Sequence, residues 1–406
     1  MHIGFIALDY PTSTSGGGVG SQTRVLARAL VKAGHRATVV ALGQNTSSSP
    51  TEDEGVKIYR VAPGNIHYYV SRFPGMKSLV ATAIRELEYS RAVWNAVKAI
   101  HKLEPFDVLE GTETGSLFAA LGGPKLPLVI RLHGETFTFY KYTPGMKVTA
   151  GLKLSRAIQR IALRRCHMLI SPSASHLREI STELHGHHPP AEVIPNAVGQ
   201  AGPNVAESPE PRLQEIVASS NPLVLCIGRI EQCKGISILL EAAAKVGATV
   251  SDCRFVFAGA SHPTLKQSEL TDLIGRLEIK SNVTFLGHVT QDQLTHLYSK
   301  AAITVVPSHY ETFGLSALES MKCAVPVVAT TAGSLPEVVV DGETGLLVPP
   351  GNAQALADSV IRLLTDEVLR YKLATNARQW AETFFIDRLV SGNIAAYKRA
   401  ASVELG

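Results

Sequence analysis

Short apolar runs alternate with amphipathic segments along the whole chain of 406 residues. This rhythm is typical of parallel strands that are buried on both faces by the helices connecting them. Between the first two runs, residues 21–33 place apolar side chains at helical spacing, and Gly34 supplies a stop signal. In the first half the apolar runs predict strands at 3–7, 37–41, 56–61, 108–110, 128–132 and 168–171.

The character of the sequence changes at residues 197–222, which are rich in Pro, Ser, Gly and Glu and open no apolar run before Leu223. This composition predicts a linker. The same alternation then resumes, so we expect an α/β protein of two doubly wound Rossmann-like domains, 1–196 and 223–380, facing each other across a cleft. The predicted strands of the second domain are 223–227, 254–258, 283–286, 303–306, 326–329 and 346–348.

A final helical stretch, about 369–401, is longer than the second domain needs. We expect its end, about 380–406, to pack back on the first domain. A helix that caps its own domain is the alternative that the sequence leaves open.

Composition and charge exclude several classes of protein. The chain is 45% hydrophobic and 18% charged, and 39 Lys and Arg against 35 Asp and Glu leave a formal charge of +4. That balance is too even for a nucleic-acid-binding protein. The 5 cysteines form no Cys-x-x-Cys pair, which argues against a disulfide framework and a structural zinc site. The N-terminus reads as a first strand, and no run reaches the ~20 apolar residues of a membrane span, so we expect a cytoplasmic protein.

The segment from Glu311 to Glu319 follows a predicted strand and opens a helix near Leu315. Backbone N–H groups at such a helix N-terminus favour an anion, for instance a diphosphate. The two carboxylates could reach sugar and ribose hydroxyls. The alternative is a pair of ordinary surface glutamates, one of them complementing the helix dipole.

Two cations flank the loop that follows the first strand of the second domain. Arg229 and Lys234 could converge there on a leaving diphosphate. The loop is not a Walker A motif, because Lys234 follows Cys233 and precedes Gly235. Two solvated side chains are the alternative reading.

A glycine-rich loop, Gly16, Gly17 and Gly18, joins the first strand to the first helix and would let backbone approach a ligand closely. The third glycine of a dinucleotide fingerprint would fall at Ser21, which disfavours an NAD enzyme. His133 ends another strand, where it could contact a sugar hydroxyl or serve a structural role.

Metal binding is not expected. The acidic run Glu52-Asp53-Glu54 lies in a Ser/Thr-rich stretch and is predicted to face solvent. No Asp-x-Asp occurs, so a divalent cation bridging substrate phosphates lacks its usual carboxylate pair. Residues 147–165 form a basic amphipathic segment, which predicts either peripheral membrane contact or an ordinary surface helix.

Taken together, these elements resemble the retaining GT-B glycosyltransferases of family 4. Further family-like phrases lie at 193–197, 285–289, 333–337 and 341–348. The resemblance spans nearly the whole chain and is strongest from Ile194 to Asn352. The sequence departs from the family at Glu110, because many relatives carry His at this position. The resemblance therefore does not say which residue activates the acceptor.

The resemblance implies a role for each matching residue. Arg229 and Lys234 would bind the donor diphosphate, and Glu319 the ribose hydroxyls. Glu311 would bind the donor sugar, and His133 would contact that sugar from the other domain. The remaining donor-binding positions would be Gly16, Gly17, Gly18, Val289, Phe313, Gly314 and Leu315.

The implied reaction moves a sugar from a nucleotide-diphosphate donor to the hydroxyl of a sugar or glycolipid acceptor, with retention and without metal or other cofactor. A UDP-sugar is favoured over GDP-mannose. The alternatives are a nucleotide-sugar epimerase and a nucleotide-sugar binding subunit without catalysis.

Overall fold

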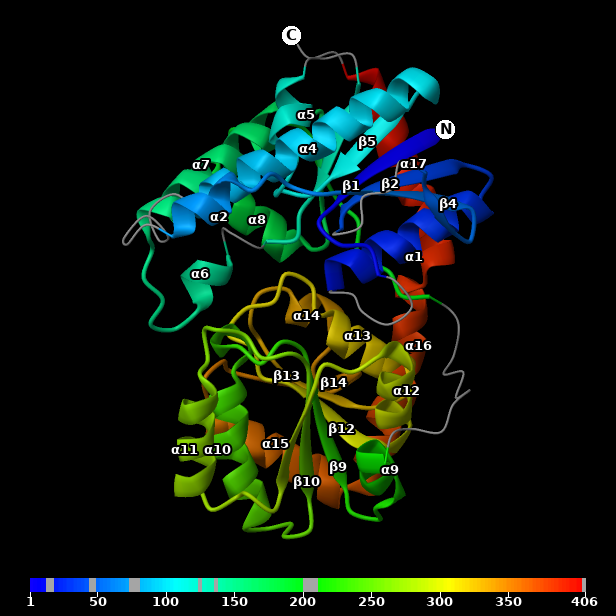
Figure 1. The fold of residues 1–406 in the computed structure, drawn as a ribbon. Helices are drawn as coiled ribbons and strands as arrows, with labels where there is room; N and C mark the ends of the chain where they lie inside the picture. The colour runs from blue at the N-terminus through cyan, green and yellow to red at the C-terminus, as the bar shows by residue number, and fades with distance from the viewer. Residues whose placement is uncertain are drawn as a thin grey trace. The chain divides into compact units, whose positions relative to one another are not determined.

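The computed structural model describes residues 1–11, 18–43, 49–72, 81–122, 126–134, 138–199 and 211–403, and these form two units (Figure 1). Unit 1 comprises Met1–Lys141, Lys147–Gly199 and Ile386–Gly406. Unit 2 comprises Tyr142–Met146 and Gln200–Phe385.

Unit 1 is built on a sheet whose strand order is β3-β4-β2-β1-β5-β6-β7-β8. Its strands are parallel except for the antiparallel pair β3 and β4. The strands are β1 (His2–Ala7), β2 (Arg36–Leu42), β3 (Thr51–Asp53), β4 (Val56–Val61), β5 (Val108–Gly111), β6 (Leu128–Arg131), β7 (Met168–Ser171) and β8 (Ala191–Val193).

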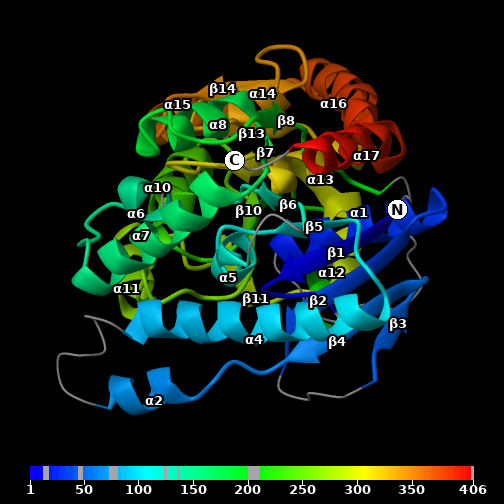
Figure 2. The same ribbon diagram turned by 90° about the horizontal axis from the view of Figure 1, so that it is seen from above.

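Two groups of helices cover the opposite faces of this sheet. Ile3 and Phe5 pack with α1 (Gly18–Lys32) and α17 (Ile386–Ser402), whereas Ile6 packs with α4 (Ala81–Leu103) and its neighbours on the other face. Figure 2 shows α4 and α17 on either side of β1 and β2. The other helices of unit 1 are α2 (Ile66–Ser71), α5 (Leu117–Leu121), α7 (Ala150–Arg165) and α8 (Ala174–Glu183). The short helix α6 (Phe139–Tyr142) ends with the first residue counted in unit 2.

The strands of unit 1 fall where the apolar runs predict them because those runs are buried from both sides. Every residue of β1, β5, β6 and β7 is buried, as expected of central parallel strands. Helix α1 begins three residues earlier than expected and ends before Gly34, whose φ of +84° suits a glycine.

Unit 2 has a sheet of order β11-β10-β9-β12-β13-β14, with all pairs parallel. Counted within the unit this is 3-2-1-4-5-6, the order of the Rossmann fold. The strands are β9 (Leu223–Ile227), β10 (Arg254–Ala258), β11 (Val283–Gly287), β12 (Ala301–Val306), β13 (Val327–Thr330) and β14 (Gly345–Val348).

Helices also cover both faces of the second sheet (Figure 1). One face packs against α10 (Ile236–Gly247), α11 (Gln267–Arg276) and α15 (Ala353–Thr365), and the other against α9 (Pro211–Ala218) and α12 (Gln291–Lys300). The remaining helical elements are η1 (Gln232–Lys234), α13 (Leu315–Lys322), α14 (Leu335–Val338), α16 (Glu367–Ala381) and η2 (Glu382–Phe384).

The prediction of a linker over 197–222 is wrong in part. Residues Pro211–Ala218 form α9, and Leu213 and Ile216 are buried against Leu223 of β9. The Pro- and Ser-rich composition conceals an apolar i, i+3 pair that is enough to dock one short helix. Residues 200–210 of the expected linker lie outside the described part of the chain.

The prediction that Glu52-Asp53-Glu54 faces solvent is also wrong for its central residue. Asp53 ends β3 and accepts hydrogen bonds from Tyr10 Oη at 2.7 Å, Arg24 Nε at 3.1 Å and Arg28 Nε at 2.9 Å. Although burial opposes ionisation, these hydrogen bonds lower the pKa of Asp53 well below its usual range. The carboxylate therefore ties the short edge strand to α1.

The C-terminal stretch is two helices joined through η2. Trp380 lies in the last turn of α16, and its indole Nε1 donates to Val338 O at 2.8 Å, also in unit 2. At the start of α17, Ile386 N donates to Val198 O at 3.1 Å. Ala396 and Tyr397 of α17 then enter the core of unit 1.

A buried charge network joins α17 to the first sheet. Glu110 of β5 accepts hydrogen bonds from Arg131 Nε at 2.9 Å and from Tyr397 Oη at 2.7 Å, and Arg131 also donates to Asn393. Burial alone would lower the pKa of Arg131, but the facing carboxylate raises it above its ordinary value. Glu110 is thus engaged in holding α17 and is only 5% exposed.

Candidate active site

The topology of unit 2 brings two loops together at one point of the sheet. Strands β9 and β12 are neighbours at the centre of the sheet. The strand that follows β9 in sequence, β10, lies on one side of this pair, and the strand that follows β12, β13, lies on the other. Open α/β sheets bind ligands outside the carboxyl ends of the strands at such a switch point. The loop after β9 carries Arg229 and Lys234, and the loop after β12 carries Glu311.

Lys234 and Glu311 meet in this place. Nζ of Lys234 lies 2.7 Å from Oε1 of Glu311, which also accepts a hydrogen bond from Ser308 Oγ at 2.8 Å. Burial alone would lower the pKa of Lys234, but Glu311 raises it above the usual value. The ammonium therefore stays charged and balances a carboxylate that is 11% exposed.

The backbone beneath Glu311 is held by the turn that follows β13. Ser334 donates to Glu311 O from its N at 3.0 Å and from its Oγ at 2.9 Å. Gly333 has a φ of +59°, and a Cβ there would lie 2.1 Å from Glu311 O. Only glycine allows this approach. The Gly-Ser turn was visible in the sequence as a family-like phrase, but its role in supporting Glu311 was not.

Helix α13 begins at the same edge. Gly314 precedes it with a φ of +102° and has no side chain with which to cap the first N–H groups of the helix. Phe313 is buried and packs edge-on against Phe384, with ring centroids 5.8 Å apart. Leu315 is half-buried at the first helical position. The start of α13 is thus a place where an anion is favoured.

Glu319 lies one turn into α13, as its spacing from Leu315 requires. Its Oε2 accepts a hydrogen bond from Tyr298 Oη at 3.3 Å, and burial raises the pKa of Glu319 above the usual value. The side chain is half-buried. Val289 lies farther along the sheet, after the edge strand β11, and packs partly against the cluster under α12.

Arg229 has a partner that the sequence did not reveal. Its Nη2 lies 3.3 Å from Oε1 of Glu231, whose side chain is 1% exposed, while the Arg229 side chain is 57% exposed. His262, from the loop after β10, places Nδ1 3.7 Å from the other oxygen of Glu231. Neither Glu231 nor His262 belongs to a pattern that marks it in the sequence, because their proximity arises from the pairing of β9 with β10.

In unit 1, His133 follows β6 in the place that its sequence position predicts. Its N–H and that of Gly134 donate to Glu113 Oε1, at 2.7 and 2.8 Å. Burial, with smaller effects from Arg131 and His176, lowers the pKa of His133 to about 3. The imidazole is therefore neutral at physiological pH. Glu113, which is 2% exposed, is a further residue that sequence reasoning missed.

Gly18 opens α1 and is exposed, whereas Gly16 and Gly17 lie outside the described residues. Within the described ranges no cluster of three or more His, Cys, Asp or Glu side chains has an arrangement that could hold a metal ion. No helix in that same part of the chain is long and apolar enough to cross a membrane.

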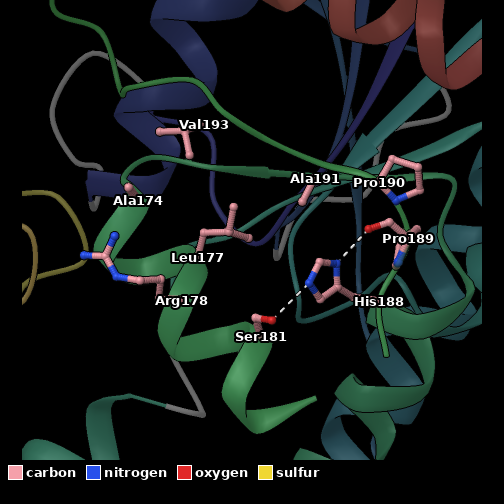
Figure 3. A pocket seen from close by; sticks show the side chains of 9 residues that line it. All are labelled: Ala174, Leu177, Arg178, Ser181, His188, Pro189, Pro190, Ala191 and Val193. Atoms are coloured by element: carbon pink, nitrogen blue, oxygen red, sulfur yellow. Dashed lines mark hydrogen bonds between the residues drawn. The ribbon is translucent and has the colours of Figure 1, made fainter. Parts of the chain in front are cut away.

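A hollow of about 570 Å³ lies in unit 1 between α8 and β8 (Figure 3). Leu177, Arg178 and His188 are among its lining residues. His188 Nδ1 is 2.7 Å from Pro189 O and its Nε2 is 3.2 Å from Ser181 Oγ. Both ring nitrogens of His188 are thus engaged within the wall of the hollow.

Two α/β units built on mainly parallel sheets are the architecture of the GT-B fold of glycosyltransferases. A family model described as "Glycosyl transferases group 1" matches residues 210–380, and one described as "Glycosyl transferase 4-like domain" matches residues 17–197. The chain belongs to the group 1 glycosyltransferases. The expected family, fold class and enzyme class are thereby confirmed.

Curated relatives support the same family. The chain is 36% identical over 156 residues to alpha-D-kanosaminyltransferase of Streptomyces kanamyceticus, covering 38% of this chain and 40% of that one. It is 35% identical over 225 residues to the D-inositol 3-phosphate glycosyltransferase of Acidothermus cellulolyticus, covering 54% and 50%. These matches span half or less of either relative. An uncharacterized glycosyltransferase of Methanocaldococcus jannaschii is 26% identical over 98% of both chains.

Solved structures share the fold over nearly the full length. Sucrose-phosphate synthase from Thermosynechococcus elongatus has a TM-score of 0.80 at 22% identity and covers 98% of both chains. Anabaena HepE, in complex with UDP and glucose, has a TM-score of 0.67 at 20% identity, over 98% of this chain and 100% of its own.

Proposed function

We propose that the chain transfers a glycosyl group from a nucleoside-diphosphate sugar to a hydroxyl of a sugar or glycolipid acceptor, with retention at the anomeric carbon and without a metal ion. A UDP-sugar is the preferred donor and GDP-mannose the alternative. The observation that carries the proposal is the Lys234–Glu311 pair, 2.7 Å apart beside the start of α13.

In this proposal the diphosphate binds Arg229 and Lys234. Its charge competes with Glu311 for the Lys234 ammonium, so that donor binding releases part of the carboxylate. Glu311 can then accept hydrogen bonds from the hydroxyls of the donor sugar. This exchange suits the arrangement, because an ammonium already paired with a carboxylate is in place without an uncompensated buried charge.

The other donor-binding residues that we propose in unit 2 lie on the same edge of its sheet. Glu319 accepts from the ribose hydroxyls, and Val289 lies by the base. Backbone N–H groups at Phe313, Gly314 and Leu315 contact the donor at the start of α13. The family resemblance further assigns His133 to the donor sugar and Gly16, Gly17 and Gly18 to its phosphates, of which Gly16 and Gly17 lie outside the described residues.

The chemical step breaks the bond between the anomeric carbon and the diphosphate oxygen. The acceptor oxygen forms its bond to that carbon on the same face, and the departing phosphate oxygen takes the acceptor's proton. The charge that grows on the diphosphate is met by Arg229, Lys234 and the dipole of α13. Preorganised groups of this kind stabilise a transition state without further reorganisation.

The UDP complex of HepE supports the choice of a uridine nucleotide, since that protein shares the fold. The names of the curated relatives support a hydroxyl acceptor, because an inositol phosphate carries hydroxyls on its ring. Neither likeness assigns the acceptor of this chain, so acceptor identity is part of the test.

The test is a panel of UDP- and GDP-sugars scored for thermal stabilisation and for slow nucleotide release. A ligand at 100 times its Kd should add about 2.7 kcal/mol to the stability. One donor should stabilise the protein and release its nucleotide faster when an acceptor is added. An NMR spectrum of donor incubated alone that shows conversion of the sugar would favour an epimerase. Tight binding with neither hydrolysis nor transfer would favour a binding subunit.

We also propose that α7 makes peripheral contact with an anionic membrane. Leu154 and Ile161 are 45% and 44% exposed on its outer side, and Lys153, Arg164 and Arg165 are exposed beside them. A helix face that combines exposed apolar and basic side chains can lie at the headgroup region of a membrane that contains anionic lipids. Two further basic residues of the helix, Arg156 and Arg160, are each paired at 2.8 Å with Glu183.

Sedimentation with vesicles tests this contact. Binding to phosphatidylglycerol vesicles and not to phosphatidylcholine vesicles, with loss of binding at high salt, is the expected result. The double variant Leu154→Ser, Ile161→Ser should bind more weakly at unchanged thermal stability. Equal recovery of the wild type with both kinds of vesicle, or with neither, contradicts the proposal.

A further inference from the structure

The loops that follow β9 and β10 are joined beyond the ends of the strands. Ile230 N donates to Ala260 O at 2.9 Å, and His262 N donates back to Ile230 O at 3.1 Å. The two loops approach so closely that a Cβ on Gly259 would lie 1.8 Å from Gly228 O. This pairing brings the residue after Ile230, which is Glu231, next to His262.

Glu231 is a buried carboxylate between two basic side chains. Its Oε1 lies 3.3 Å from Arg229 Nη2, and its Oε2 lies 3.7 Å from His262 Nδ1. No side chain or backbone group that the structure describes donates a hydrogen bond to Oε2.

Folding stability does not account for this carboxylate. A buried acceptor without a hydrogen bond is unfavourable, and a buried charge is more so. A neutral side chain of the same shape would fill the space without the cost of burying a charge. The arrangement does fix one edge of the Arg229 guanidinium, while more than half of the Arg229 side chain is exposed.

We propose that Glu231 is a positioning residue, which holds Arg229 through Oε1 so that the Arg229 guanidinium is oriented for the donor diphosphate. This inference rests on the proposed function, which places the diphosphate at Arg229 and Lys234. Glu231 itself does not touch the donor. Its effect on binding therefore passes through Arg229.

A double-mutant cycle of Glu231→Gln and Arg229→Ala tests the proposal. The Kd is measured by calorimetry for UDP and by NMR titration for uridine, with GDP and guanosine as the second pair. A charge-assisted contact predicts a loss of about 10- to 100-fold in UDP affinity for Arg229→Ala. Glu231→Gln should lose about 5- to 20-fold for UDP and leave uridine unchanged. Because it acts through Arg229, it should add less than about twofold in the Arg229→Ala background.

The control is Glu241→Gln, the same substitution at an exposed position of α10 in the same unit, and it should bind UDP like the wild type. If Glu231→Gln does not fold, Glu231→Asp takes its place in the cycle, since it withdraws the carboxylate from Arg229 and keeps the charge. Additive losses in the double variant, or equal losses for UDP and uridine, overturn the positioning role. A wild type that binds neither nucleotide, or an Arg229→Ala variant that binds both normally, overturns the proposed function instead.

Discussion

Replacing Lys234 with alanine removes one of the two cations at the edge of unit 2 and leaves Glu311 without its ammonium. The two charged atoms are 2.7 Å apart, and their side chains are 26% and 11% exposed. At an effective dielectric constant of about 20, this separation corresponds to an attraction of about 6 kcal/mol before solvation is counted. Solvent screening and the cost of burying both charges reduce the net stabilisation to about 1–3 kcal/mol.

The expected effect on turnover is larger than the effect on folding. Removing a preorganised group that meets transition-state charge costs roughly 100- to 1,000-fold in kcat. We expect a loss of about that size for Lys234→Ala, with a smaller change in KM for the donor, because the charge on the diphosphate grows as the bond breaks.

The assay is nucleotide release from the donor that the panel identifies, with thermal unfolding measured on the same samples. Lys245→Ala, at an exposed position of α10, is the matched control and should turn over like the wild type. Lys234→Arg should recover part of the rate, since it restores the charge with a different shape. A folded Lys234→Ala variant whose kcat stays within about threefold of the wild type would refute the electrostatic reasoning.

Three further substitutions probe the supports of the fold. Asp53→Asn should destabilise unit 1 by about 1–3 kcal/mol at neutral pH. Because folding lowers the pKa of Asp53 below the ordinary 3.8, its stabilisation is complete above that value and is lost as the pH falls through the folded pKa, so urea titrations of the two proteins should converge in acid. Gly333→Ala should weaken donor binding at least tenfold, since its Cβ would lie 2.1 Å from the Glu311 carbonyl oxygen. The control is Gly342→Ala, at a position with φ +72° and open space around it, and it should leave donor affinity unchanged. Equal donor affinities of the two variants would contradict the role of Gly333 in supporting Glu311. Tyr397→Phe removes a buried donor from Glu110 and should cost about 1–3 kcal/mol in unfolding, and an unchanged unfolding midpoint would contradict that estimate.

Most strands could be located from the sequence because burial on both faces leaves a continuous apolar run. The expected runs at 56–61, 168–171 and 223–227 coincide with β4, β7 and β9. The short edge strands β3 and β8 could not be located from the sequence, since Thr51–Asp53 and Ala191–Val193 are mostly polar or half-exposed. Periodicity also gives no order of strands, and that order is what sets β9 beside β12.

The residues of the candidate site also fall into two groups, those whose positions the sequence predicts and those whose surroundings it does not. The positions of Arg229, Lys234 and Glu311 could be predicted because each lies in a segment that follows a strand, and such segments of a parallel sheet meet at its carboxyl edge. Glu231 and Glu113 could not. Their roles depend on which loop packs beside them, and neither a buried carboxylate nor its backbone donors leave a pattern in the sequence.

The hydrogen bond from Ile386 N to Val198 O has a practical consequence for protein engineering. It brings the residue before Gly199 next to Ile386, where the chain returns to unit 1. The segment from Gln200 to Phe385, which makes up most of unit 2, is therefore an insertion in unit 1. Joining Gly199 directly to Ile386 should excise that segment and keep α17 with its own sheet, whereas a simple C-terminal truncation would strip unit 1 of a core helix. Exchange of this segment between relatives is therefore best attempted at these two junctions.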